Sequence, residues 1–281
     1  MYPPAAMSSL LIFDFDGTAT LSEVEALPFV AAYREDLAAL CRWSQPAADA
    51  RIDAMLAAME ADPRAWAFRL GGRAVAPATV DPYLRMGAIA EALLDELGAL
   101  RDPDDRARVT GGLLYRKNYA LTLLAPAFRE DATAVFGALQ GREVYVVTNS
   151  GTEHVQGKVR TLGQEWLVSR VRGDARKFVI EDSFDRVPAE LHLDGLDRPV
   201  LLRRRPYFSV LDGLRSTLGV AWSDVWVVGD IFELDLALPW ALGANVVLIA
   251  NERTPTWERR FVEREAHVVE SLTAAKALLP G

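Results

Sequence analysis

Two aspartates, Asp14 and Asp16, end a short apolar run, Leu10–Phe13, and are followed directly by Gly17. Side chains two positions apart on a strand point the same way, so both carboxylates can reach one small volume beyond the strand. Carboxylates this close repel each other unless a cation or a shared proton lies between them. The spacing therefore indicates a divalent-metal site or an acid–base pair. Gly17 allows a sharp turn, and we expect its backbone N–H to lie close to whatever sits between the carboxylates.

An aspartate before glycine is also common in ordinary turns, so further polar clusters must decide between a turn and a site. Two other apolar runs are also followed directly by polar residues. Thr148 and Asn149 follow the run 143–147, and a segment from Asp230 to Asp235 follows the run 225–228. Ligands of open parallel sheets bind outside the carboxyl ends of the strands. Three such ends with polar side chains predict one shared site.

The elements that must position these residues are typical of an α/β protein. Apolar strand patterns alternate with helical patterns after about residue 140, which predicts a doubly wound parallel sheet with helices on both faces. Residues 21–129 are helical by pattern, and a crossover needs only a dozen or so residues. We therefore predict a core formed by residues 1–20 and 130–281, with 21–129 as an inserted all-helical domain. The connection 173–199 is longer than the fold needs and is either a small flap or a surface elaboration.

Composition narrows the possible partners. The formal net charge is −8, with acidic and basic residues interspersed, which argues against nucleic acid or an anionic membrane as a partner. Cys41 is the only cysteine, so no intramolecular disulfide can form, and we expect a cytoplasmic protein. The N-terminal residues 1–7 lack the features of a signal peptide. The chain is expected to be a monomer or a homodimer.

On these motifs the chain resembles the haloacid dehalogenase-like (HAD) superfamily of phosphohydrolases. The run Asp14-Phe15-Asp16-Gly17-Thr18 matches the first motif of that superfamily, and Thr148 at the end of an apolar strand matches the second. The run from Gly229 to Asp235 matches the fourth, in its Gly-Asp-x4-Asp form. The helical insert is similar to the cap domain that many members carry after the first motif.

The resemblance implies roles for the acidic residues. Asp14 would be the nucleophile that forms an aspartyl-phosphate, and Asp16 would protonate the leaving alcohol and then take a proton from water. Asp14, the backbone carbonyl of Asp16, and Asp230 would hold Mg²⁺, a cation that prefers oxygen ligands. Asp235 would orient Asp230 or a metal-bound water.

The resemblance also implies where the phosphoryl group binds. Thr148 and neighbouring backbone N–H groups would contact its oxygens, since the protein's work here is mostly positioning and charge neutralisation. We include Asn149 in this group, together with Gly17 and Thr18 of the first motif.

The third motif departs from the family pattern. Members usually have a lysine, often before a proline, where this chain reads Arg203-Arg204-Arg205-Pro206. Arg205 is the first candidate for the basic position, although arginine and lysine are not interchangeable. Lys177 is the second candidate and Lys158 the third.

The leading hypothesis is therefore a Mg²⁺-dependent phosphatase acting on a small phosphate ester. A phosphomutase would need the same carboxylates and remains open. Cleavage of a carbon–halogen bond would also use an aspartate nucleophile, but it needs neither the second acid nor a metal. A non-catalytic binding protein is the last alternative, and an arginine at the lysine position would favour it.

Overall fold

The computed structural model describes residues 9–280. The expectation about a signal peptide concerns residues 1–7 and lies outside this range. The described chain forms two compact units. The first comprises the residues up to Leu21 together with those from Phe128 onward, and the second spans Ser22–Ala127.

A six-stranded sheet forms the centre of the first unit. Its strand order is β10-β9-β8-β1-β4-β5, and every neighbouring pair is parallel. The strands are β1 (Leu10–Phe13), β4 (Val144–Val147), β5 (Val171–Arg172), β8 (Val225–Gly229), β9 (Asn245–Ile249) and β10 (His267–Val269). The prediction of a doubly wound parallel sheet is confirmed.

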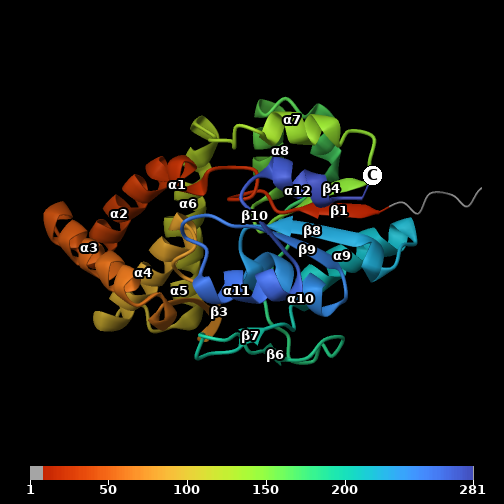
Figure 1. The fold of residues 1–281 in the computed structure, drawn as a ribbon. Helices are drawn as coiled ribbons and strands as arrows, with labels where there is room; N and C mark the ends of the chain where they lie inside the picture. The colour runs from red at the N-terminus through yellow and green to blue at the C-terminus, as the bar shows by residue number, and fades with distance from the viewer. Residues whose placement is uncertain (1–8, 281) are drawn as a thin grey trace, which may run out of the picture. The chain divides into compact units, whose positions relative to one another are not determined.

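Both faces of the sheet are covered by helices (Figure 1). One face carries α7 (Ala132–Ala138), α8 (Thr152–Thr161) and α12 (Leu272–Leu278), and the other carries α9 (Arg205–Leu218), α10 (Ala237–Ala241) and α11 (Thr256–Glu265). Successive residues of β1 therefore enter different cores. Leu10 and Ile12 pack into one, while Leu11 and Phe13 pack into the other. Burial on both faces explains why the strand is apolar throughout.

The chain changes direction at β1. It passes from β1 to β4 and β5 on one side, and then returns to β8, β9 and β10 on the other. Ligands of doubly wound sheets bind at such a switch point, beyond the carboxyl ends of the strands. The ends of β1, β4 and β8 all lie there.

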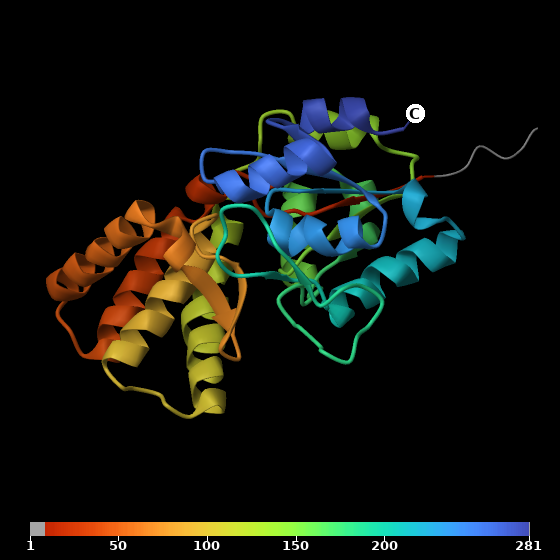
Figure 2. The ribbon, with the colours of Figure 1, turned by 60° about the horizontal axis from the view of Figure 1, so that its bottom comes forward.

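The long connection before α9 contains a short antiparallel pair, β6 (Glu190–Leu191) and β7 (Val200–Leu201). It runs below the sheet in Figure 1 and comes forward in Figure 2. Four of its apolar side chains, Phe184, Val187, Leu193 and Leu196, are buried in the same core as α9. The connection is therefore built into the core of the first unit.

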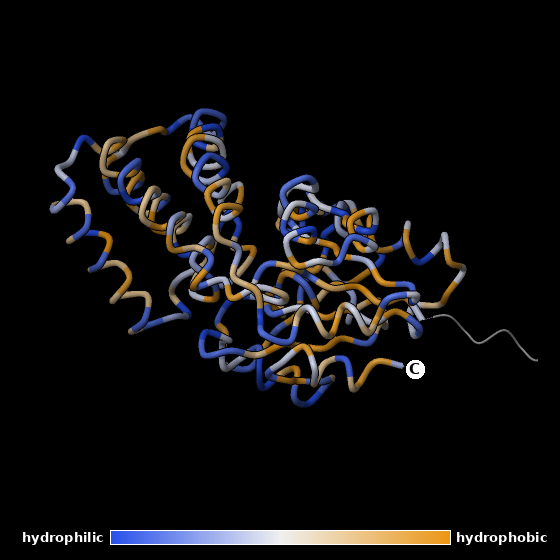
Figure 3. The backbone as a smooth tube through the Cα atoms, turned by 90° about the horizontal axis from the view of Figure 1, so that it is seen from above, coloured by the Kyte–Doolittle hydropathy of each residue, from blue (hydrophilic) through white to orange (hydrophobic). Residues whose placement is uncertain are grey.

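The second unit is mainly helical, with hydrophobic and hydrophilic stretches alternating along its helices (Figure 3). Its main helices are α2 (Leu27–Cys41), α3 (Gln45–Ala61) and α4 (Pro82–Glu96), followed by a wide-turn segment, η2 (Arg108–Arg116). Shorter pieces are α1 (Ser22–Glu25), η1 (Pro63–Ala65), α5 (Pro103–Ala107), α6 (Lys117–Tyr119) and η3 (Ala120–Leu124). Within the described chain, every helix is too short or too polar to span a lipid bilayer.

One prediction about this unit was wrong: it is not all-helical. Strands β2 (Ala67–Leu70) and β3 (Arg73–Pro77) form an antiparallel hairpin. Gly71 and Gly72 connect them with φ angles of 57° and 77°. Glycine tolerates positive φ at both central positions of a tight hairpin turn, so the Gly-Gly pair marks the turn of a hairpin.

Candidate active site

The first motif, the second motif and the fourth motif each follow a strand of the sheet. Asp14 follows β1, and its backbone N–H donates to the carbonyl of Val228 in β8 at 2.8 Å. Thr148 follows β4, and its backbone N–H donates to the carbonyl of Arg172 in β5 at 3.0 Å. Asp230 follows β8 directly. The hydrogen bonds between neighbouring strands therefore continue into the site and fix the backbone of Asp14 and of Thr148.

Three buried carboxylates meet at this point. One oxygen from each of Asp14, Asp230 and Asp235 lies within 4.8 Å of the others. A wide helical turn, η6 (Phe232–Leu236), brings Asp235 back toward the end of β8. Gly229 makes the close approach possible, because a Cβ atom there would lie 2.6 Å from Cβ of Asp235.

Lys177 is the cation of this cluster. Its Nζ donates to Oδ1 of Asp14 at 2.7 Å and to Oδ1 of Asp235 at 2.8 Å. Burial raises the pKa of Asp14 to about 8, with Lys177 opposing the rise and Asp235 adding to it. Burial alone would lower the pKa of Lys177, but Asp14 and Asp235 outweigh it and raise that pKa. The ammonium therefore stays charged and offsets part of the repulsion among the carboxylates.

The loop before Lys177 has an unusual backbone. Asp174 and Arg176 adopt φ angles of 51° and 52°, which are uncommon for residues other than glycine. Gly173 precedes them in a tight place, where a Cβ atom would lie 2.3 Å from a backbone nitrogen of the neighbouring segment. At the end of the loop the Lys177 N–H donates to Oδ1 of Asn149 at 2.7 Å. The strained loop and this hydrogen bond aim Lys177 at the carboxylates.

Asp16 lies in a second cluster beside the first. Nζ of Lys158, a fully buried residue of α8, donates to Oδ1 of Asp16 at 2.7 Å. The Ser150 hydroxyl donates to Oδ2 at 2.5 Å. His154 lies one turn before Lys158, and burial together with that ammonium lowers the pKa of His154 to about 4. The side chain of Asp16 is not one of the three clustered carboxylates, so only its backbone carbonyl remains a predicted metal ligand.

Gly17 and Thr18 support Asp230. Gly17 has a φ of 84°, and a Cβ atom there would lie 2.2 Å from Oδ2 of Asp230. The Thr18 hydroxyl donates to Oδ1 of Asp230 at 3.0 Å. The Gly17 N–H donates to Oγ1 of Thr20 at 3.1 Å. The local turn therefore uses the N–H that we expected to lie close to the group held between the carboxylates.

Thr148 and Asn149 reach the site in different ways. Thr148 is buried at the end of β4, where its hydroxyl oxygen accepts from the N–H of Ser150 at 3.2 Å. That contact leaves the hydroxyl hydrogen to donate elsewhere. The Asn149 carbonyl oxygen holds the backbone of Lys177, so the structure gives Asn149 a supporting contact where we predicted a substrate contact.

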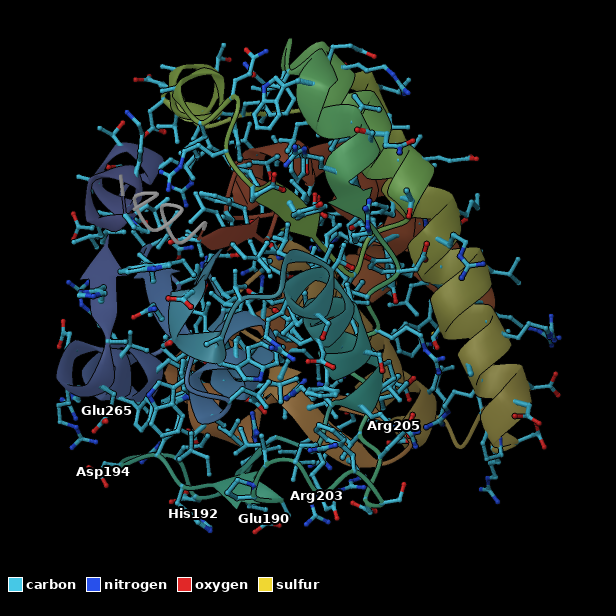
Figure 4. The ribbon with its side chains drawn as sticks, turned by 90° about the vertical axis from the view of Figure 1, so that its right-hand side faces the viewer. Glu190, His192, Asp194, Arg203, Arg205 and Glu265 are labelled. Carbon is cyan, nitrogen blue, oxygen red and sulfur yellow. The ribbon has the colours of Figure 1, made fainter. Side chains whose placement is uncertain are left out.

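Arg205 does not join the site. It begins α9 and lies at the edge of the molecule in Figure 4. Its side chain is 58% exposed and pairs with Glu181 at 3.6 Å. Pro206 follows as the second residue of the helix, and the first turn carries the Arg205 side chain outward. Our first choice for the basic position was therefore wrong, and Lys177 is the residue that contacts the carboxylates.

The fourth motif has buried support that sequence reasoning missed. Glu258 of α11 accepts from the backbone N–H groups of Phe232 and Glu233 at 2.9 and 3.0 Å. Burial raises the pKa of Glu258 to about 8, and the charge of Glu233 adds to the rise. Arg198 donates to both carboxylate oxygens of Glu233, at 2.8 and 2.7 Å. Glu233 was visible inside the motif, but nothing in the pattern of α11 sets Glu258 apart.

The donor set suits a hard divalent cation. Such ions bind carboxylate and carbonyl oxygens, and three converging buried carboxylates supply that chemistry. Lys177 balances only part of their charge, so a further cation would relieve the remaining repulsion. Asp14, Asp230 and Asp235 are the residues that could hold it.

Comparison with known proteins agrees with the Rossmann-like fold. A family model described as haloacid dehalogenase-like hydrolase matches residues 9–238. The chain belongs to this family of hydrolases. No curated protein sequence matches it.

Solved structures share the fold at low sequence identity. A predicted phosphoglycolate phosphatase from Haemophilus somnus has a TM-score of 0.57 at 15% identity, with 97% of this chain and 98% of that chain covered. The HAD-hydrolase YfnB from Bacillus subtilis, bound to magnesium, has a TM-score of 0.53 at 14% identity, with coverage of 98% and 99%. A HAD phosphatase from Thermococcus onnurineus has a TM-score of 0.51 at 12% identity, with coverage of 97% and 98%.

Proposed function

We propose that this hydrolase is a Mg²⁺-dependent phosphatase that cleaves a small phosphomonoester through an aspartyl-phosphate. The observation that carries the proposal is the position of Lys177, whose ammonium contacts both Asp14 and Asp235 within the group of three buried carboxylates. Cations beside a nucleophilic carboxylate are what a dianionic phosphate ester requires, since otherwise two anions would have to approach each other.

Asp14 is the proposed nucleophile. One of its carboxylate oxygens forms a bond to phosphorus while the ester oxygen leaves with the bonding electron pair and takes a proton. Lys177 holds Oδ1 of Asp14 and so orients the carboxylate for this attack. Asp14, Asp230 and Asp235 would hold Mg²⁺, which when bound supplies positive charge against the phosphoryl oxygens. The Thr148 hydroxyl, whose oxygen accepts from the Ser150 N–H, would donate its hydrogen to one of those oxygens.

Asp16 is the proposed acid and base. In the second step it takes a proton from water, whose oxygen attacks phosphorus, releases inorganic phosphate and regenerates Asp14. The Lys158 ammonium at 2.7 Å favours the ionised carboxylate, which suits this base role directly. For the acid role in the first step, Asp16 must take up a proton as the substrate binds.

The second unit is the proposed cap. It is inserted between β1 and β4, the strands that carry the first and second motifs. A domain that closes over an active site excludes water and bulky polymers, so we infer that the substrate is a small molecule. A phosphatase and a magnesium-bound hydrolase among the similar folds are consistent with this proposal.

The alternatives differ in what they require. A phosphomutase would use the same residues and differ only in the acceptor of the phosphoryl group. Carbon–halogen cleavage leaves Asp16 and Asp230 without a role. A non-catalytic binding protein was favoured only by an arginine at the lysine position, and Lys177 in contact with Asp14 removes that reason.

The test is hydrolysis of p-nitrophenyl phosphate by the full chain, with Mg²⁺ and with EDTA, followed by a panel of sugar, nucleotide and amino-acid phosphates. We expect metal-dependent release of phosphate that Asp14→Asn abolishes. Asp185→Asn, a substitution at an exposed aspartate of the first unit, is the matched control and should leave the rate unchanged. Activity that survives Asp14→Asn, or no turnover on any ester of the panel, would contradict the proposal.

A further inference from the structure

The middle arginine of the run Arg203-Arg204-Arg205 is fully buried, unlike exposed Arg205. Its Nη1 donates to the backbone carbonyl of Lys177 at 2.6 Å, and its Nε donates to the carbonyl of Leu201 at 2.9 Å. Its Nη2 lies 3.9 Å from Oε1 of Glu233. One planar guanidinium therefore contacts the loop that carries Lys177 and the turn that carries Asp230 and Asp235.

Keeping a charge at this position is costly. Burial lowers the pKa of Arg204 to about 10, although the charges of Glu233 and Asp235 oppose the change. The side chain is therefore still a cation at neutral pH. A position that needed only volume would be filled as well by an apolar side chain, because a buried charge adds stability only when its geometry and hydrogen bonds are good. The hydrogen bonds of Arg204 to the carbonyls of Lys177 and Leu201 meet this condition and indicate that the charge serves to hold the Lys177 loop.

The backbone of Lys177 is held from two sides. Its N–H donates to Asn149, next to the end of β4, and its carbonyl accepts from Arg204. The first contact joins Lys177 to the second motif. The second joins it to a residue that also contacts Glu233, in the middle of the fourth motif.

Glu233 is the shared partner on the other side. Arg198 binds both carboxylate oxygens of Glu233. The backbone N–H of Glu233 donates to Glu258. The turn between Asp230 and Asp235 is thus tied to the connection before α9 by two arginines. Arg198 contacts Glu233, whereas Arg204 contacts both Glu233 and Lys177.

We propose that Arg204 is a positioning residue of the active site, which sets the Lys177 ammonium against Asp14 and Asp235. This inference rests on the proposed function where activity is concerned, but its geometric part does not. It also gives Arg198 and Arg204, at the end of the long connection before α9, a role in turnover, because both reach Glu233.

The experiment compares Arg204→Met with Arg205→Met, the same change one residue further along on an exposed side chain. The chain has only four lysines, Lys117, Lys158, Lys177 and Lys276, so ¹⁵N-lysine labelling gives a spectrum simple enough to resolve buried ammonium groups. Lys177→Arg assigns the Lys177 signal. This readout needs neither substrate nor metal, so it stays informative if the phosphatase proposal fails.

We expect Arg204→Met to shift or broaden the Lys177 ammonium signal and to leave that of Lys158 in place. With p-nitrophenyl phosphate, kcat should fall by about 10- to 100-fold with KM changed by less than about threefold, because a displacement near 1 Å has effects of this size. Arg205→Met should match the wild type in both measurements. Arg204→Lys, which keeps the charge but not the two-pronged contact, should recover part of kcat.

An unchanged Lys177 signal in folded Arg204→Met would overturn the inference, whatever the activity. So would wild-type kcat in that variant. If Arg204→Met does not fold, Arg204→Lys decides by the same two readouts. Unfolding of both variants would make Arg204 a residue of general stability and would also refute a positioning role.

Discussion

The ammonium of Lys177 lies 2.7 Å from Oδ1 of Asp14, although 163 positions separate the two residues in the chain. The same ammonium lies 2.8 Å from Oδ1 of Asp235, a further 58 positions along. One cation thus joins the segments that follow β1 and β8, and its loss has consequences for both charge balance and chemistry.

Replacing Lys177 with methionine should leave three buried carboxylates without their cation. Removal of one partner from a buried pair costs about 3–5 kcal/mol, so the metal-free variant should unfold at lower urea concentration than the wild type at pH 7.5. Added Mg²⁺ should restore part of the loss, and kcat/KM should fall by about 100-fold or more. Lys117→Met, at an exposed lysine, is the control. Equal stability of Lys177→Met and wild type without metal would contradict this account.

Replacing Lys158 with methionine should distinguish the role of Lys158 from that of Lys177. Lys158 contacts Asp16 and is not part of the group formed by Asp14, Asp230 and Asp235. We therefore expect kcat to fall by about 10- to 100-fold, the range of a general acid–base contribution. Mg²⁺ affinity, measured by calorimetry, should stay close to that of the wild type, with Lys276→Met as the control. A loss of Mg²⁺ affinity as large as that of kcat would show that the two clusters are not independent.

Replacing Gly17 with alanine tests the contact between the first motif and Asp230. The new Cβ atom would lie 2.2 Å from Oδ2 of Asp230, so that carboxylate must move and Mg²⁺ affinity should fall at least tenfold. Gly219→Ala is a matched control, because Gly219 also has positive φ, 70°, but no atom lies within 4 Å of the added Cβ. Both variants should lose about 1–3 kcal/mol of stability from backbone strain. Equal Mg²⁺ affinity in the two variants would contradict the contact.

Glu258 should make stability depend on pH. Its pKa is about 8 in the folded chain against an ordinary value of 4.5, so the folded state binds the proton more tightly than the unfolded state. The stabilisation is complete below about pH 4.5 and is lost as pH rises toward 8, with a slope of up to about 1.4 kcal/mol per pH unit. The groups that face it are Glu233 and Asp235, and the N–H groups of Phe232 and Glu233 oppose the shift.

The measurement is urea unfolding of the metal-free protein from pH 5 to 8.5. Glu258→Gln cannot ionise and should show a flatter dependence than the wild type, whereas Glu265→Gln, at an exposed position of the same helix, should not. Asp14 contributes a slope of the same sign in all three proteins, because burial also raises its pKa to about 8. Parallel curves for Glu258→Gln and wild type would rule out the titration of Glu258.

Much of the fold and part of the site could be predicted from the sequence. Strand ends were readable because a strand buried on both faces is apolar until the chain leaves the sheet, and Asp14, Thr148 and Asp230 stand at those points. The basic position was not readable in this way. Lys177 reaches Asp14 through a loop in which Asp174 and Arg176 take positive φ without being glycine, so composition gives no sign of the turn.

The choice of Arg205 and the missed hairpin have different causes. Within the arginine run, Arg204 points into the core and Arg205 into solvent, a difference set by where α9 begins. The first residue of a helix cannot be located to within one residue from sequence alone, so the direction of each arginine side chain could not be predicted. The hairpin of the second unit did have a signal, because Gly71-Gly72 lies between two short segments that contain apolar residues. A helical pattern on both sides concealed it.

The strand order also bears on how the protein is made. Asp14 is synthesised before its neighbour β8, and Asp230 and Asp235 follow only after β8. A nascent chain that stops before β8 has half of the central sheet missing and no carboxylate partner for Lys177 other than Asp14. The group of carboxylates around Lys177 is therefore complete only after β8 and the fourth motif have been synthesised, so assembly of this group reports how far co-translational folding has proceeded.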